Sequence, residues 1–176
     1  MSPREQAPWS VPVRLDQIGR GLTRKLSPTE QERTHIAAQL DLASLDRLDA
    51  EVEVTPTTLG WRLRGSFSAH VVQTCGVTLE PLPSDIDGRF TVEVVETLQE
   101  EPESSADHEL GLDSYDPPDV AEEGVVDLGA YVVEHLALEL DPFPRKPGAA
   151  FEPPAAEVEP SPFAALAKLR RDKDEP

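Results

Sequence analysis

Three runs of alternating apolar and polar residues between positions 48 and 94 place the strongest constraint on the fold of this chain. Side chains of a strand point alternately to its two faces, so each run predicts a strand with one buried face. Three consecutive strands with short connections predict an antiparallel meander whose other face is solvated. The apolar positions of the three runs are Leu48, Ala50, Val52 and Val54, then Trp61, Leu63, Gly65, Phe67, Ala69 and Val71, then Ile86, Gly88, Phe90, Val92 and Val94.

Charged residues on the solvated face are expected to fix the register of the first two strands. The segment PTTLG, residues 56–60, separates these strands and predicts a hairpin. Glu51 and Glu53 on the first strand should therefore meet Arg62 and Arg64 on the second, because opposite charges that face each other favour one register.

The N-terminal part of the chain contains a further strand pattern. Trp9, Val11, Val13 and Leu15 recur at a spacing of two, which predicts a strand. Pro12 suits an edge position, because it has no N–H to donate to a neighbouring strand.

A first helix is predicted over residues 28–40. Ser27 is the expected N-cap, Pro28 fits the first helical position, and Glu30 completes a capping box. Few apolar residues follow in the helical pattern, so this helix should lie on the surface and cover one edge of the core.

A second, more amphipathic helix is predicted from its N-cap Asp127 to Leu140, and Pro142 ends it. The predicted fold is therefore an α+β domain: an antiparallel sheet, open or partly closed into a barrel, that this helix covers. The apolar stripe at helical spacing consists of Leu128, Tyr131, Val132, His135, Leu136 and Leu140.

Composition predicts the organisation of the remaining segments. Residues 1–8 should be a flexible N-terminus, and residues 9–151 the α+β domain. Within the domain, residues 96–123 contain 11 acidic residues and no Lys or Arg, which predicts a disordered, mobile acidic loop. Residues 152–160 should be a Pro/Ala/Glu linker, and residues 161–176 a short C-terminal helix that becomes ordered only on docking, to its own domain or to another molecule.

The charge of the chain bears on its partners. Asp and Glu number 34 and Lys and Arg 16, which gives a formal net charge of −18. Such a chain repels a phosphate backbone at long range, so a basic protein is the more favourable partner. The alternative is that the acidic excess only keeps the protein soluble. The absence of a secretory or membrane-spanning pattern predicts a cytoplasmic protein with no membrane partner.

Cys75, the only cysteine, follows the second strand pattern. A buried, packed side chain is the favoured interpretation, ahead of a vestige of a two-cysteine knuckle and of a reactive thiol. His70, the nearest candidate base, is an odd number of residues away and should point to the opposite face. The four histidines and one cysteine match no metal-binding spacing, so no metal is predicted.

No sequence pattern indicates an enzyme. The chain has no Gly-rich phosphate loop, no HExxH and no GxSxG. His135 is expected to be a half-buried residue of the second helix, His108 lies in the acidic loop, and Glu134 and Glu139 should be solvated. We therefore predict no catalytic residue and no cofactor.

The segment DPFPRKPG, residues 141–148, has two interpretations. Its prolines hold Arg145 and Lys146 on a nearly extended backbone, where they could contact an anion or a partner. The favoured interpretation is a rigid covering segment that packs Phe143 onto the sheet.

Two long segments together resemble the bacterial YceD family, the large ribosomal RNA subunit accumulation proteins. They are VVQTCGVTLEPLPSDIDGRFTVEV and, after the acidic insert, VVDLGAYVVEHLALELDPFPRKPGAAF. The resemblance covers residues 9–151, and the terminal SPFAALAKLR is similar to the end of some members.

The resemblance implies a role in accumulation or processing of 23S rRNA, without enzymatic activity. Many members carry a C-x-x-C pair where this chain has Cys75 and Thr78, so a two-cysteine metal knuckle is excluded here and the turn should be architectural. The motif residues that the resemblance marks as structural or partner-binding are Cys75, Thr78, Leu79, Glu80, Pro81, Asp127, Leu128, Gly129, Glu134, Leu138, Pro142, Pro144 and Arg145.

Resemblance and charge together give the functional hypothesis. The chain should assist large-subunit biogenesis by binding a basic ribosomal or assembly protein through its acidic surface. A thiol or hydrolytic enzyme is a third, less favoured hypothesis. The second hypothesis is direct rRNA binding through basic residues: Arg62, Arg64, Arg145, Lys146, Lys168, Arg170 and Arg171.

Overall fold

The computed structural model describes residues 7–97 and 117–150. The chain divides after Lys146 into two units, and the first contains every helix and strand described below. The segment 1–8, predicted to be a flexible N-terminus, is described only from Ala7. The predictions for residues 98–116, His108, the linker and the C-terminal helix lie outside the described residues.

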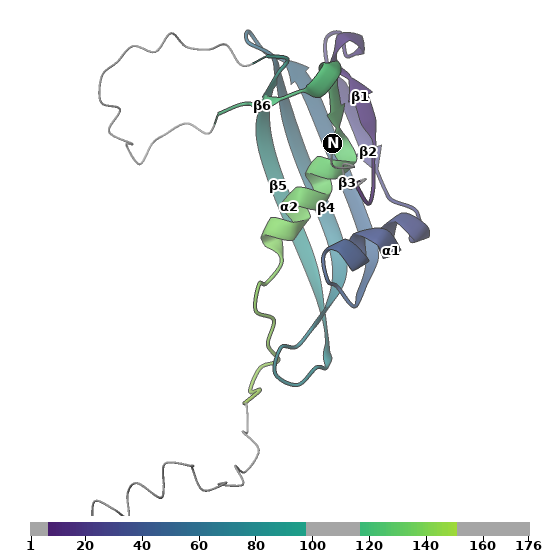
Figure 1. The fold of residues 1–176 in the computed structure, drawn as a ribbon, viewed down its shortest axis with the longest axis vertical. Helices are drawn as coiled ribbons and strands as arrows, with labels where there is room; N and C mark the ends of the chain where they lie inside the picture. The colour runs from purple at the N-terminus through teal and green to yellow at the C-terminus, as the bar shows by residue number, and fades with distance from the viewer. Residues whose placement is uncertain (1–6, 98–116, 151–176) are drawn as a thin grey trace, which may run out of the picture. The chain divides into compact units, whose positions relative to one another are not determined.

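A five-stranded sheet forms the centre of the structure, in the order β2-β3-β4-β5-β6 (Figure 1). Its neighbours pair antiparallel except β5 and β6, which pair parallel. The predicted meander β3-β4-β5 is confirmed, and in the described part of the chain the sheet is open rather than closed into a barrel. The strands are β2 (Leu22–Leu26), β3 (Ser44–Pro56), β4 (Trp61–Thr74), β5 (Pro81–Val95) and β6 (Asp119–Val120).

Burial follows the predicted alternation along β3 and β4. Val52, Val54, Leu63 and Val71 are fully buried, whereas the residues between them face the other side of the sheet. Two glycines make room for aromatic rings on the neighbouring strand: a Cβ at Gly65 would meet the ring of Phe90, and a Cβ at Gly88 would meet the ring of Phe67. The two glycines in these apolar runs therefore serve packing.

The charged pairs expected across the β3–β4 hairpin form only in part. Glu53 lies opposite Arg64 as predicted, but Glu51 lies opposite Ser66 and pairs with Lys25 of β2 at 3.8 Å. Arg62 forms its ion pair with Glu93 of β5. The prediction for Glu51 and Arg62 was wrong because a central strand has two neighbours, and each of these residues pairs with the neighbour outside the hairpin.

A second, two-stranded sheet joins the N-terminal segment to the end of the domain. β1 (Pro12–Arg14) pairs antiparallel with β7 (Val125–Asp127), and Leu15 begins the short 3-10 helix η1 (Leu15–Gln17). The predicted N-terminal strand is therefore shorter than its pattern, and Pro12 lies in this two-stranded sheet. The predicted acidic loop, residues 96–123, was too long at its C-terminal end. The strand β6 and the 3-10 helix η2 (Glu122–Gly124) begin within it.

Helix α1 (Glu30–Gln39) begins two residues later than predicted. Its N-cap is Thr29, which forms the capping box with Glu32. The predicted cap Ser27 instead donates a hydrogen bond to Asp49 on β3 at 2.6 Å. The prediction was wrong because SPTE and TEQE both fit the capping pattern, and the bond to β3 uses the first serine.

Helix α2 (Leu128–Glu139) begins after its predicted N-cap Asp127. Leu128, Val132 and Leu136 are fully buried against the sheet, which confirms the covering helix. Figure 1 shows α1 and α2 over the same face of the sheet, so its other face is left uncovered by helices. Among the described residues, no helix is long and apolar enough to cross a membrane.

Candidate partner-binding surfaces

The turn at residues 75–80 joins β4 to β5 and contains the single cysteine. The Cys75 N–H donates to the Glu80 carbonyl at 2.9 Å, and the Leu79 N–H donates to the Cys75 carbonyl at 2.9 Å. Leu79 closes the turn with a φ of 59° and leaves its side chain exposed, while Pro81 begins β5. These bonds hold the chain reversal at the end of the long β4–β5 pair.

The Cys75 sulfur is a buried hydrogen-bond acceptor. The backbone N–H groups of Thr78 and Lys146 each lie 3.4 Å from Sγ. Hydrogen bonding from the Thr78 hydroxyl and from these N–H groups lowers the pKa of Cys75 to about 6, because such bonds favour the thiolate. The side chain is fully buried, as predicted, so its sulfur faces protein donors rather than solvent.

His70 does not approach the thiol. Its Nδ1 lies 2.9 Å from Asp85, and Arg47 lies 3.6 Å from the same carboxylate. The hydrogen bond from His70 holds the pKa of Asp85 below its usual value. Within residues 7–97 and 117–150, no group of three or more His, Cys, Asp or Glu side chains is arranged to hold a metal ion.

The segment that follows α2 is fastened to the turn. The Gly76 N–H donates to the Pro144 carbonyl at 2.9 Å, and Lys146 Nζ lies 3.0 Å from Glu80. Lys146 also lowers the pKa of Glu80. Sequence analysis missed these contacts, since nothing in residues 75–80 indicates which distant segment donates to them.

Phe143 does not pack onto the sheet. Its side chain is 76% exposed, so the predicted covering role of DPFPRKPG is wrong. Pro142 ends the helix as expected, and the Asp141 carboxylate accepts a hydrogen bond from the Phe143 N–H at 2.9 Å. The prolines stiffen a segment that presents its aromatic ring to solvent, and Arg145 beside it is exposed as well.

Asp127 connects α2 to the N-terminal segment. Its carboxylate caps the helix through the N–H groups of Gly129 and Ala130, and accepts from Val11 N and Ser10 Oγ. The buried Gly129 lets the helix approach this segment, because a Cβ there would lie 2.9 Å from the Trp9 carbonyl oxygen.

The remaining side chains of α2 divide between a buried and an exposed side. His135 stacks on Phe90 with ring centroids 4.2 Å apart and is half-buried, as predicted. Glu134, Leu138 and Glu139 are exposed, so two of the motif residues lie on the outer side of the helix.

A groove of about 800 Å³ lies where α1 and α2 both end. One wall is formed by the end of α1 and the turn after β4, and the other by the last turn of α2 and residues 141–145. The motif residues Pro142, Pro144 and Arg145 line it together with Phe143.

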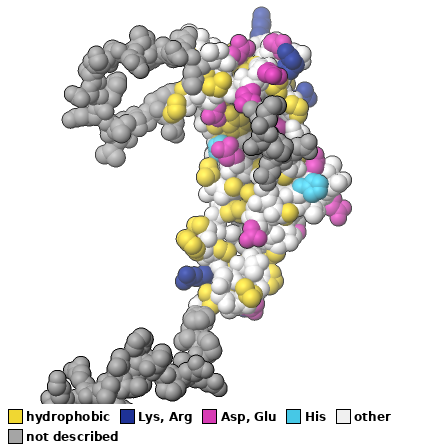
Figure 2. Space-filling model, in the orientation of Figure 1, with side chains coloured by type: hydrophobic (Ala, Val, Ile, Leu, Met, Phe, Trp, Pro, Cys, Tyr) yellow, Lys and Arg dark blue, Asp and Glu magenta, His cyan; other side chains and the backbone are white. Residues whose placement is uncertain are grey.

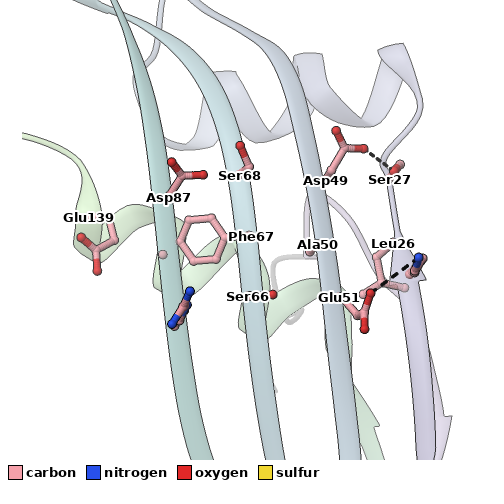
Figure 3. Close-up of a pocket in the computed structure, with 13 residues that line it drawn as sticks. Leu26, Ser27, Asp49, Ala50, Glu51, Ser66, Phe67, Ser68, Asp87 and Glu139 are labelled. Atoms are coloured by element: carbon pink, nitrogen blue, oxygen red, sulfur yellow. Dashed lines mark hydrogen bonds and ion pairs between the residues drawn. The ribbon is translucent and has the colours of Figure 1, made fainter.

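The uncovered face of the sheet, called the open face below, carries both charges. Figure 3 shows Asp49, Glu51, Ser66, Ser68 and Asp87 around a hollow of about 830 Å³ that crosses β2 to β5, and Glu139 at the end of α2 also lines it. Acidic and basic residues interleave here, with ion pairs Lys25–Glu51, Arg47–Asp85 and Arg62–Glu93.

The side of the molecule formed by β6, η2 and α2, called the α2 side below, has a different charge pattern. No Lys or Arg occurs between Arg89 and Arg145 in the sequence. In the view of Figure 2, Lys and Arg lie near the two ends of the visible face, with acidic and apolar side chains between them. The exposed acidic residues of these elements are Asp119, Glu122, Glu123, Glu134 and Glu139.

Tyr131 lies between two of these acids. Its hydroxyl donates to Asp119 at 2.7 Å, which ties β6 to α2. Burial, and then the carboxylates of Asp119 and Glu134, raise the pKa of Tyr131. The two carboxylates therefore make the potential around this ring negative.

Comparison with known proteins identifies the family. Residues 63–170 match the family model described as "Large ribosomal RNA subunit accumulation protein YceD". The match spans more than half of the chain and includes most of β4, the cysteine turn, α2 and the segment after it. No curated protein and no solved structure gave a significant match. The chain therefore belongs to the YceD family, whose name supports a role in the biogenesis of the large ribosomal subunit.

Proposed function

We propose that this chain acts in large-subunit biogenesis as a non-enzymatic factor that binds a basic ribosomal or assembly protein. The observation that carries the proposal is the charge of the α2 side, where exposed carboxylates occur in a stretch of 55 residues, 90–144, without Lys or Arg. A surface of one sign raises the encounter rate with a partner of the opposite sign.

Direct binding of rRNA is the less favoured alternative. Arg62 is paired with Glu93 and Lys146 with Glu80, and Arg64 faces Glu53. Arg62 and Lys146 are therefore already partly neutralised, whereas phosphate binding requires cations that can replace counterions.

A salt-dependent pull-down tests the proposal. The tagged chain should enrich basic large-subunit or assembly proteins at low salt and lose them as ionic strength rises, because screening weakens contacts between exposed charges. Nuclease treatment of the lysate should leave this enrichment unchanged. Enrichment of rRNA alone, or loss of every protein after nuclease treatment, would favour the alternative.

A further inference from the structure

We propose that the groove at the shared end of α1 and α2 binds a segment of the partner that carries both basic residues and large apolar side chains. The proposal rests on the proposed function and specifies where, and through which chemistry, the basic protein is held. It assigns a binding role to Phe143 and Leu138.

The apolar character of the site comes from side chains that the fold leaves uncovered. Phe143 is 76% exposed and Leu138 75%, and both lie within the six residues at the end of α2 and after it. Leu140 and Val77 contribute partly buried surface to the groove. Single exposed apolar residues are common, but here Phe143 lines a groove of about 800 Å³, a size that accepts a few large side chains. Leu138 follows Ala137, a lining residue on the last turn of α2.

The backbone around Phe143 is fixed before any partner binds. Asp141 accepts from the Phe143 N–H, Gln73 Nε2 donates to the Asp141 carbonyl at 2.9 Å, and the Pro144 carbonyl accepts from Gly76. Prolines on both sides of the ring restrict φ further. An aromatic side chain on a backbone that is already ordered loses little entropy on binding, which favours its use as an anchor.

The charges at the groove favour a basic segment. Asp41 and Asp141 line it, and Arg145 is the one basic residue among its described lining residues. Glu134 is exposed on the adjoining helix. A bound segment with apolar residues on one side and Lys or Arg on the other would complement both features, in the manner of an amphipathic helix in a groove.

Synthetic peptides provide the test with the full-length chain. The probe is a fluorescent peptide of about 15 residues with Leu at helical spacing and Lys elsewhere. One control peptide has Ser in place of each Leu, and a second has Glu in place of each Lys. By fluorescence anisotropy, both controls should bind about tenfold more weakly than the probe or worse.

Protein variants locate the site. Phe143→Ser and Leu138→Ser should each weaken binding of the Lys/Leu peptide about tenfold. The matched control is Leu59→Ser, because Leu59 is 77% exposed in the β3–β4 hairpin. Asp41→Asn should weaken binding about threefold at low salt, since Asn tolerates the positive φ of 53° at this position.

The outcomes separate this inference from the proposed function. Unchanged peptide binding by both Phe143→Ser and Leu138→Ser, or equal weakening by Leu59→Ser, overturns the groove even if the pull-down still enriches a basic protein. Loss of that enrichment at low salt overturns the proposed function itself. A photoreactive phenylalanine analogue at position 143 that captures only the same chain, within one molecule or between two copies, also overturns the inference.

Discussion

The open face of the sheet and the α2 side both carry many charged residues, but their arrangement differs. On the open face several acids pair with a base on a neighbouring strand, as Glu51 does with Lys25 and Glu93 with Arg62. On the α2 side Asp119 and Glu134 instead flank the same tyrosine. Net charge alone therefore does not identify a binding surface. The surface is identified by where Lys and Arg side chains lie relative to the acidic ones.

The largest expected effect separates the two sides of α2 itself. Leu136→Ala should destabilise the protein by about 2–5 kcal/mol, because Leu136 is fully buried and its removal leaves a cavity. Leu138→Ala, two residues later and 75% exposed, should change stability by less than about 0.5 kcal/mol. Chemical denaturation measures both values.

Equal stability losses from these two alanines would show that α2 does not bury one side against the sheet. The comparison of the α2 side with the open face would then lose its basis, because the exposed acids of the helix could not be assigned to a fixed surface.

A smaller effect is expected from Asp127→Ala. This carboxylate caps α2 and also accepts from Val11 and Ser10, so its loss should cost about 1–2 kcal/mol. Asp49→Ala on the open face removes a single exposed hydrogen bond with Ser27 and should cost less than about 1 kcal/mol. Thermal unfolding of the two variants checks the difference, and a larger loss for Asp49→Ala would contradict it.

The parts of this structure that the sequence predicts are those with a local pattern, namely alternating strand residues and helix caps. The buried positions of β3 and β4 and the N-cap Asp127 follow from local patterns. Contacts that depend on distant segments do not: the choice of Arg62 between Glu51 and Glu93, or of Lys146 as a donor to the Cys75 sulfur, requires the tertiary structure. β6 was missed because two residues are too few to show a period.

The surfaces themselves were only partly predictable. The acidic excess is evident from composition, but its separation from the basic residues depends on which face each strand residue occupies. Phe143 was expected to pack onto the sheet, since large aromatic residues are usually buried. Its exposure accompanies a hydrogen bond between Asp141 and the Phe143 backbone, which the sequence allows but does not require.

Removal of acidic charges tests the two surfaces through partner binding rather than through stability. Asp119→Asn with Glu134→Gln should weaken retention of a basic partner severalfold at low salt and have little effect at high salt. The amide oxygen introduced by Asp119→Asn would keep an acceptor for the Tyr131 hydroxyl. Glu51→Gln with Glu53→Gln on the open face is the matched control, and it should leave retention nearly unchanged.

If the open-face pair causes the greater loss, the assignment of the partner to the α2 side is wrong. Alternatively, the double variant Glu51→Gln, Glu53→Gln could gain nuclease-sensitive binding of RNA. Lys25 and Arg64, without the facing carboxylates, would then form a phosphate-binding surface.

The smallest expected effect on partner binding concerns Cys75, which lies in the turn between β4 and β5. Its pKa is lowered from 9.0 to about 6 by hydrogen bonds in the folded protein, so folding should favour the thiolate. The corresponding stability is present above the unfolded pKa and is lost as pH falls from about 9 through about 6. Cys75→Ser should therefore flatten the rise of the melting temperature between pH 6 and pH 9, while a pull-down at constant pH retains the same partner. A variant that folds but loses the partner would mean that the thiol acts directly in function, which would revive the hypothesis of a reactive cysteine.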